Sequence, residues 1–361
     1  MSHEPSPASA PTPAPAPAPT PTPTPTPTPA FTPNPSASGY RSVFRPGLFA
    51  GRRLWVTGGG SGIGRCVAHE LAALGAEVII SGRSVEKLER VAAEVAEDGG
   101  RCTWRAFDIR DEEAVKAGVA AVIAEGGPVH GLVNNAGGQF PAPMMAISKR
   151  GFEAVVSNNL TGGFLMMREL FLQSFQQHGG AVVNMTADFR NGMPGMAHSG
   201  AARAGMANLT MSAAFEWASF GVRVNAVAPG WIASSGMDTY GGATRGLIPL
   251  LKGHVPARRL GEEAEVSAAI VFLLSPAAAF ITGVTLQIDG GASIGTPMFP
   301  SMDHDRCVPF DGFHRAVRPE VLGGAAPQPA AGAAAPAPVP VPVPVQVSAA
   351  ASAPATLPAK D

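Results

Sequence analysis

The stretch Thr-Gly-Gly-Gly-Ser-Gly-Ile-Gly at residues 57–64 directly follows the apolar run at 54–56. A strand, a glycine turn and the start of a helix, in that order, form a cradle for the phosphates of a dinucleotide. The helix expected over 63–74 directs free N–H groups and the positive end of its dipole at those phosphates. We expect the cradle to be formed by Gly58, Ser61, Gly62, Ile63 and Gly64.

Short apolar runs alternate with segments of helical periodicity through the middle of the chain. Such repetition, with short links, is typical of a parallel sheet covered by helices on both faces. The sequence therefore predicts an α/β fold, a single doubly wound Rossmann domain, with Ser84 and Asp111 as helix N-caps. Strands are expected at 53–56, 77–81, 103–107, 130–134, 181–185, 222–227 and 284–288, and helices at 63–74, 85–98, 111–125, 150–177, 200–219 and 262–274.

Proline and alanine dominate both ends of the chain, where most of its 36 prolines lie. Segments of this composition lack the apolar content for a core and are typical of polyproline II or disorder. We therefore expect a disordered tail over 1–39, the Rossmann domain over 40–300, a C-terminal extension over 301–322 and a second disordered tail over 323–361.

Composition excludes several kinds of partner. The net charge of −1 provides no electrostatic footprint for nucleic acid. No apolar run reaches the roughly 18 residues that span a bilayer, and the N-terminus lacks a signal pattern. The three cysteines have no metal-ligand spacing, and the cluster at 303–305 is more typical of a solvated extension than of a metal site. We expect a cytoplasmic protein without a metal, a nucleic-acid partner or a membrane span.

The end of the second expected strand selects the cofactor. It carries Ser-Gly-Arg-Ser at 81–84 and no carboxylate that would bind a ribose 2′-hydroxyl. The guanidinium of Arg83 suits a 2′-phosphate, so we predict NADPH; the alternative is an ordinary surface arginine. Asp108 ends the third strand, within reach of the adenine. The end of the fourth strand passes under the ribose with Asn135, Ala136 and Gly137.

From these motifs the chain resembles the short-chain dehydrogenase/reductase family over essentially its whole folded core. The matching pieces are TGGGSGIG (57–64), NNAGG (134–138), NNLTGG (158–163), AVVNM (181–185), VRVNAVAPG (222–230) and ITG…DGG (281–291). Within the family it is most similar to peroxisomal-type trans-2-enoyl-CoA reductases, through RPGLFAGRR (45–53), HSGAARAG (198–205) and LLSPAAAFITG (273–283). A branch of citronellol/citronellal dehydrogenases is similar as well, through 193–206 and 234–240, and motifs alone do not separate the two.

The resemblance implies roles for matching positions. Asn159 matches an asparagine that holds a catalytic water, and Thr186 or its neighbour Ala187 falls where a catalytic serine is usual. The resemblance also implies a homo-oligomer, a tetramer, formed through the helices at 150–177 and 200–219. The loop that holds the nicotinamide carboxamide is matched by Pro229, Gly230, Ile232 and Ser234.

One departure from the family pattern favours one reaction over the other. The family places a tyrosine four residues before a lysine, and here those positions are Ser199 and Arg203. Alcohol oxidation needs a base of tuned pKa, which a serine hydroxyl does not supply. Reduction of a double bond conjugated to a thioester needs hydrogen-bond donors around the enolate oxygen instead. Ser199, Arg203 and Thr186 are such groups, which favours the reduction.

Tyr240 lies in the segment 231–260, where this family covers its substrate. Its phenol is suited to donating a proton from a closed lid, or to packing against an acyl chain, and both interpretations stay open. The leading hypothesis is an NADPH-dependent trans-2-enoyl-CoA reductase with an acyl-CoA substrate. The alternatives are a citronellol/citronellal-type alcohol dehydrogenase and a non-catalytic dinucleotide-binding module.

Overall fold

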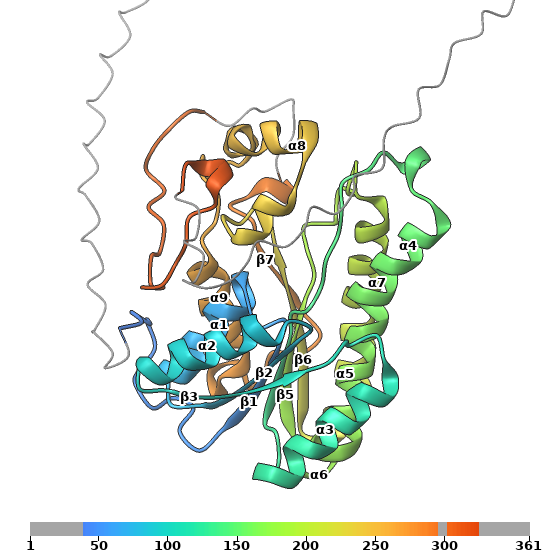
Figure 1. Cartoon of the computed structure of the whole chain (residues 1–361), viewed down its shortest axis with the longest axis vertical. Helices are drawn as coiled ribbons and strands as arrows, with labels where there is room; N and C mark the ends of the chain where they lie inside the picture. The colour runs from blue at the N-terminus through green and yellow to red at the C-terminus, as the bar shows by residue number, and fades with distance from the viewer. Residues whose placement is uncertain (1–38, 295–301, 325–361) are drawn as a thin grey trace, which may run out of the picture.

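The computed structural model describes residues 39–294 and 302–324, and nearly all of both expected tails lies outside these ranges. Seven parallel strands form one sheet in the order β3-β2-β1-β4-β5-β6-β7 (Figure 1). This confirms the predicted doubly wound Rossmann fold. The strands are β1 (Arg53–Thr57), β2 (Glu77–Gly82), β3 (Arg101–Ala106), β4 (Gly131–Asn134), β5 (Gly180–Met185), β6 (Val222–Pro229) and β7 (Thr285–Ile288).

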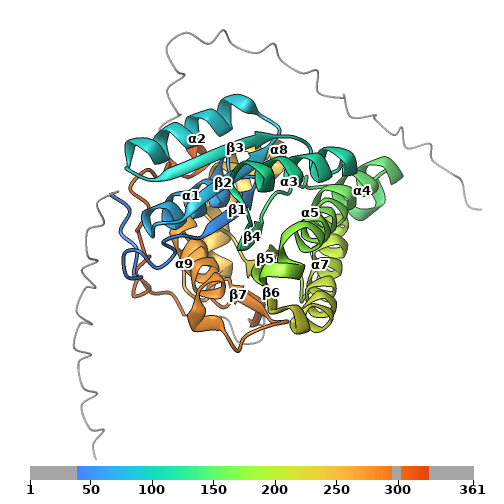
Figure 2. The same cartoon turned by 90° about the horizontal axis from the view of Figure 1, so that it is seen from below.

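Helices cover both faces of the sheet (Figure 2). On one face lie α1 (Gly62–Ala73), α2 (Val85–Glu97) and α9 (Glu263–Leu274); on the other lie α3 (Glu112–Gly126), α5 (Gly162–Leu170) and α7 (Ala197–Glu216). The residues of β1 alternate between the two resulting cores. Leu54 and Val56 pack under α1 and α9, whereas Trp55 packs under α3 and α5. Burial on both faces explains why the strand is a continuous apolar run.

The caps form as the sequence predicts. The Ser84 hydroxyl accepts a hydrogen bond from the Lys87 N–H, and the Asp111 carboxylate accepts one from the Ala114 N–H. The expected helix over 150–177 is instead three helices, α4 (Lys149–Val156), α5 and α6 (Gln176–His178), joined by π-helical turns. One of these turns, Ser157–Thr161, contains Asn159, whose side-chain amide donates to the Val155 carbonyl at 3.0 Å. Such turns commonly occur at functional sites.

The order of the strands reverses between β1 and β4, which places a crevice at their carboxyl ends. Above it lies the segment 233–260, which contains α8 (Gly242–Leu247) and which we call the lid. Residues 302–324 return across α9 and approach the lid (Figure 1). Within the described ranges, no helix is long and apolar enough to cross a bilayer.

Candidate active site

A cleft of about 660 Å³ opens at the carboxyl ends of the central strands, under the lid. It collects most of the residues singled out from sequence, although they come from widely separated segments. Those that line it are Gly58, Ser61, Gly62, Ile63, Asn135, Ala136, Gly137, Thr186, Arg203, Pro229, Gly230, Ile232, Ser234 and Tyr240. Gly64, Arg83, Asp108, Asn159 and Ser199 lie outside its lining.

The glycine turn has the shape that a phosphate cradle needs. Gly58 and Gly62 have φ angles of +67° and +56°, which favour glycine. A Cβ on Gly64 would lie 2.4 Å from the Gly58 carbonyl oxygen, so only glycine lets α1 start this close to β1. A Cβ on Gly62 would meet nothing nearer than the Glu263 carboxyl, at 3.9 Å, which leaves its backbone open to a ligand. The cradle therefore fits a dinucleotide pyrophosphate.

Thr57, the last residue of β1, is hydrogen-bonded to the loop that follows β4 at the crevice, a role that the sequence analysis missed. Its hydroxyl oxygen accepts hydrogen bonds from the N–H groups of Asn135 and Ala136 at 3.0 and 2.9 Å. In return, the Asn135 amide donates to the Thr57 carbonyl at 2.9 Å. The loop after β4 is thereby fixed beside the glycine turn.

Asn159 is buried and holds the same loop from the other side. Its amide donates to the Gly138 carbonyl at 2.6 Å, and its oxygen accepts from the Gly138 N–H at 3.0 Å. A Cβ on Gly137 would lie 2.5 Å from the Asn159 oxygen and 2.8 Å from Nη2 of Arg203. The absence of a side chain at Gly137 lets both groups approach the loop.

Arg203 supplies a fixed positive charge in the cleft. Its side chain is buried, Nη1 donates to the Met185 carbonyl at 2.7 Å, and Nε has no partner among the described residues. Burial lowers the pKa of Arg203 to about 10, against an electrostatic interaction with Tyr240 that raises it. The guanidinium is still protonated at neutral pH, so it can stabilise a developing negative charge.

Tyr240 is tied to the rigid part of the site through Gln139, which the sequence analysis did not single out. The Ser199 hydroxyl donates to the Gln139 side-chain oxygen, and the Gln139 amide donates to the Tyr240 hydroxyl at 3.1 Å. Because the phenol oxygen accepts this bond, its own proton is available for a ligand in the cleft. Ser199 is fully buried and reaches the cleft through Gln139. No local sequence pattern marks a contact between residues so far apart.

Thr186 has no hydroxyl proton left to offer a ligand, unlike Tyr240. Its hydroxyl donates to the Val227 carbonyl at 2.8 Å, so toward a ligand it presents lone pairs and no proton. His198 lies beside this region, and its Nδ1 accepts from the Ser199 N–H at 3.0 Å. Of the three oxyanion donors expected from the sequence, Thr186 and Ser199 thus donate to protein acceptors, whereas Arg203 lines the cleft with an N–H group to spare.

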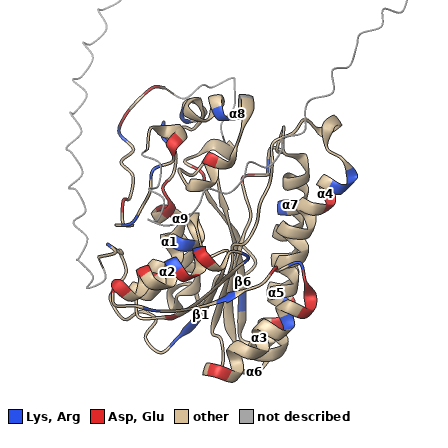
Figure 3. Ribbon diagram, viewed as in Figure 1, with Lys and Arg blue, Asp and Glu red and all other residues tan. Residues whose placement is uncertain are grey.

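At the other end of the crevice, charged side chains gather where β2 and β3 end. Arg110 forms a salt bridge with Asp108 at 2.5 Å, and its hydrogen bonds hold the pKa of Asp108 below the ordinary value. Arg83 is exposed nearby, and its charge also acts on Asp108. In the view of Figure 3, charges of both signs are scattered elsewhere over the molecule. This end of the crevice thus offers two guanidinium groups.

One group of possible metal ligands lies away from the cleft within the described residues. His69, Asp98 and His314 bring their ligand atoms within 4.8 Å of one another. Arg315 already donates to both oxygens of Asp98, at 2.8 and 3.0 Å, so these side chains form an ion-pair network. It joins α1 and α2 to residues 302–324.

Comparison with known proteins places this geometry in a family. A family model described as Enoyl-(Acyl carrier protein) reductase matches residues 58–293. The chain belongs to the short-chain dehydrogenase/reductase family. The match spans β2 to β7, the glycine turn and the lid, so the family resemblance seen in the motifs is confirmed.

Relatives within the family carry out different oxidations and reductions. The chain is 34% identical over 261 residues to the peroxisomal 2,4-dienoyl-CoA reductase of Pongo abelii, covering 72% of this chain and 89% of that one. It is 33% identical to the gluconate 5-dehydrogenase of Gluconobacter oxydans (strain 621H), covering 69% and 98%. A solved citronellol catabolism dehydrogenase from Pseudomonas aeruginosa PAO1 is 60% identical, with a TM-score of 0.64 and coverage of 70% and 100%. The chain is thus an oxidoreductase of this short-chain family.

Proposed function

We propose that this short-chain reductase catalyses the NADPH-dependent reduction of the double bond of trans-2-enoyl-CoA thioesters. The observation that carries the proposal is the pairing of a buried guanidinium with a phenol, both lining the cleft, where the family's tyrosine position holds a buried serine. Four relatives named peroxisomal 2,4-dienoyl-CoA reductases support the substrate class. The cytoplasmic location stays a prediction.

The chemistry follows from the two donors. When bound, NADPH supplies a hydride, which the β-carbon of the enoyl group accepts. Negative charge then gathers on the thioester oxygen, where the protonated guanidinium of Arg203 stabilises it. The Tyr240 hydroxyl gives its proton to the α-carbon and regains one from water, to which its half-buried side chain has access. The products are the saturated thioester and the oxidised cofactor.

The test is the consumption of NADPH by the purified protein with trans-2-decenoyl-CoA as substrate. Turnover with the saturated acyl-CoA as product supports the proposal. NADPH binding without turnover of this thioester or of citronellal would instead indicate a non-catalytic dinucleotide-binding module.

A second candidate is the oxidation of a citronellol-type alcohol. The 60% identity to the Pseudomonas aeruginosa protein favours it. The electrostatic interaction between Tyr240 and Arg203 favours it too, because it pairs a phenol with a cation, as the family's tyrosine and lysine do. We place it second because the phenol comes from the lid and accepts its hydrogen bond from a neutral amide.

Cofactor choice gives one prediction. Because Arg83 is exposed where β2 ends, and β2 itself ends in Ser81 and Gly82 without a carboxylate that would bind a 2′-hydroxyl, Arg83→Ala is expected to raise KM for NADPH about tenfold. KM for NADH should stay unchanged, since NADH lacks the 2′-phosphate. The control is Arg101→Ala, which removes an exposed arginine at the opposite end of β3. An equal effect of Arg83→Ala on both cofactors would contradict NADPH selection.

Glu263 gives a pH dependence. Burial raises the pKa of its carboxyl to about 7, with Arg65 opposing and Glu262 adding to the shift, and it faces Gly62 in the cradle. Above pH 7 it ionises beside the bound pyrophosphate, so NADPH affinity should fall as pH rises through 7. The pKa of this carboxyl in the folded protein exceeds its ordinary value of 4.5. The free energy of unfolding therefore also falls as pH rises from about 4.5 to 7, and it stays lower above that range.

The measurement for Glu263 is the Kd for NADPH against pH, by titration calorimetry, for the protein and for Glu263→Gln. The variant should bind with a flat profile across pH 6 to 8. An unchanged slope in the variant would show that another group causes the dependence.

We also propose a homo-oligomer, a tetramer. Apolar side chains stand exposed on the outer helical face, with Phe215 87% and Met211 52% exposed on α7, and Leu172 54% exposed beyond α5. Apolar side chains gathered on one exposed face are typical of protein–protein contact. Light scattering of the purified protein should give a mass four times that of the chain, and a monomer mass would contradict the proposal.

A further inference from the structure

Residues 302–324, which we call the strap, lie beyond the family match at 58–293 and cross from the body of the domain to the lid. We propose that the strap completes the active site by holding Asp238, and that Asp238 thereby positions Tyr240 over the substrate. This inference rests on the proposed function, in which Tyr240 is the proton donor.

The lid end of the strap is held by two backbone hydrogen bonds. The N–H groups of Glu320 and Val321 donate to the two carboxylate oxygens of Asp238, each at 3.1 Å. Arg245 of α8 adds a second tie, since it donates to the Asp238 carbonyl at 3.3 Å and lies 3.5 Å from the Glu320 carboxylate. Tyr240 is two residues beyond Asp238, so a shift of Asp238 moves the phenol.

The body end of the strap is anchored more firmly. Phe313 is 2% exposed and packs against Tyr40 and His69, with ring centroids 5.8 and 5.2 Å apart. Arg315 pairs with Asp98 at 2.8 Å and with Glu97 at 2.9 Å, and hydrogen bonds from Arg315 lower the pKa of Asp98. The strap therefore connects the lid to a fixed point on α1 and α2.

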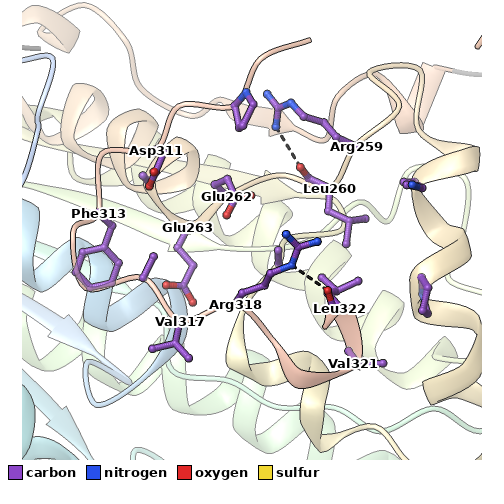
Figure 4. A pocket seen from close by; sticks show the side chains of 16 residues that line it. Arg259, Leu260, Glu262, Glu263, Asp311, Phe313, Val317, Arg318, Val321 and Leu322 are labelled. Carbon is purple, nitrogen blue, oxygen red and sulfur yellow. Dashed lines mark hydrogen bonds between the residues drawn. The ribbon is translucent and has the colours of Figure 1, made fainter. Parts of the chain in front are cut away.

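Between its two ends the strap borders a second cavity of about 660 Å³ (Figure 4). The strap contributes Phe313, Val317 and Leu322 to the lining of this cavity, and the start of α9 contributes Glu262 and Glu263. Because this space is not filled by side chains, close packing does not fix the strap against α9 there. Residues 302–308 are hydrogen-bonded to Pro256, Arg258 and Arg259 at the far end of the lid, so the bonds at Asp238 restrain chiefly the stretch of the lid that carries Tyr240.

Tyr240 needs this restraint because little else holds it. Among the described residues, its hydroxyl has one hydrogen bond, to Gln139, and its N–H bonds to Met237 within the lid itself. The hydrogen bond from Gln139 orients the phenol, and the bonds at Asp238 fix the position of the backbone that carries Tyr240. Asp238 is thus a positioning residue that acts through Tyr240.

A double-mutant cycle on the full chain tests the inference. Asp238→Ala is expected to lower kcat for trans-2-decenoyl-CoA about tenfold while Kd for NADPH stays unchanged, and Asp238→Asn, which keeps one acceptor, should recover part of the rate. In the Tyr240→Phe background, Asp238→Ala should have almost no further effect. The matched control is Asp305→Ala, which removes an exposed aspartate of the strap. Equal losses from Asp238→Ala in both backgrounds would overturn the inference.

Hydrogen exchange of lid peptides separates failure of this inference from failure of the proposed function, since it needs no substrate. Amides at 235–250 should exchange faster in Asp238→Ala than in the unaltered protein or in Asp305→Ala. Faster exchange without any enoyl-CoA turnover would leave the strap's hold on the lid in place and remove the proposed reaction. Unchanged exchange would overturn the strap's role whatever the protein reduces.

Discussion

Tyr240→Phe is expected to lower kcat for enoyl-thioester reduction about a hundredfold, because general acid catalysis typically contributes between 10² and 10⁴. The substitution keeps the ring, so packing against a substrate chain is preserved, and only the hydroxyl that accepts from Gln139 is lost. KM for NADPH should stay within about twofold. Steady-state kinetics with trans-2-decenoyl-CoA provide the measurement.

The same variant resolves the two interpretations that the sequence leaves open for Tyr240. If the side chain only packs against an acyl chain, Tyr240→Phe keeps the full rate, whereas Tyr240→Ala raises KM for the thioester. A full rate in Tyr240→Phe would therefore remove it as the proton donor.

Arg203→Met is expected to lower kcat by a factor of 10² to 10³, since loss of one oxyanion donor typically raises the barrier by about 3 kcal/mol. Methionine approximates the length of the buried side chain without its charge; the substitution removes the hydrogen bond from Nη1 to the Met185 carbonyl, whereas Nε has no partner among the described residues. The pKa of about 10 adds a second expectation, because loss of the charge above that pH should lower the rate of the unaltered enzyme.

Arg223→Met is the matched control for this loss. Burial also lowers the pKa of Arg223, and its guanidinium donates to the carbonyls of Leu273 and Leu274, away from the cleft. It should lower Tm and leave kcat unchanged. If Arg203→Met keeps more than about a third of the activity, the enolate is stabilised by another group.

The fold could be predicted because its determinants are local. The inner strands are largely buried on both faces, and the two at the centre of the crevice side appear as unbroken apolar runs at residues 54–56 and 78–80. Gly58 is required by its positive φ angle, and Gly64 is required because a Cβ there would lie 2.4 Å from a backbone oxygen. The spacing of these two glycines therefore predicts the turn. Capping by Ser84 and Asp111 likewise depends on residues three positions apart.

The candidate site could be predicted only in part, because its decisive contacts are not local. Gln139 meets Tyr240 across 101 positions and Ser199 across 60, through loops without any periodicity. The direction of the Thr186 hydroxyl is set by the neighbouring strand β6, and the strap's bonds to Asp238 span 82 and 83 positions. The spacing of Ser199 and Arg203 places them on one helix face but does not show how deeply either is buried.

The most direct test compares two reactions of the purified full chain at equal enzyme concentration. Reduction of trans-2-decenoyl-CoA with NADPH should be at least about a hundredfold faster, in kcat/KM, than oxidation of citronellol with NADP⁺. Rapid citronellol oxidation by a protein that leaves the unsaturated thioester untouched would contradict the assignment of Arg203 and Tyr240 to enolate chemistry.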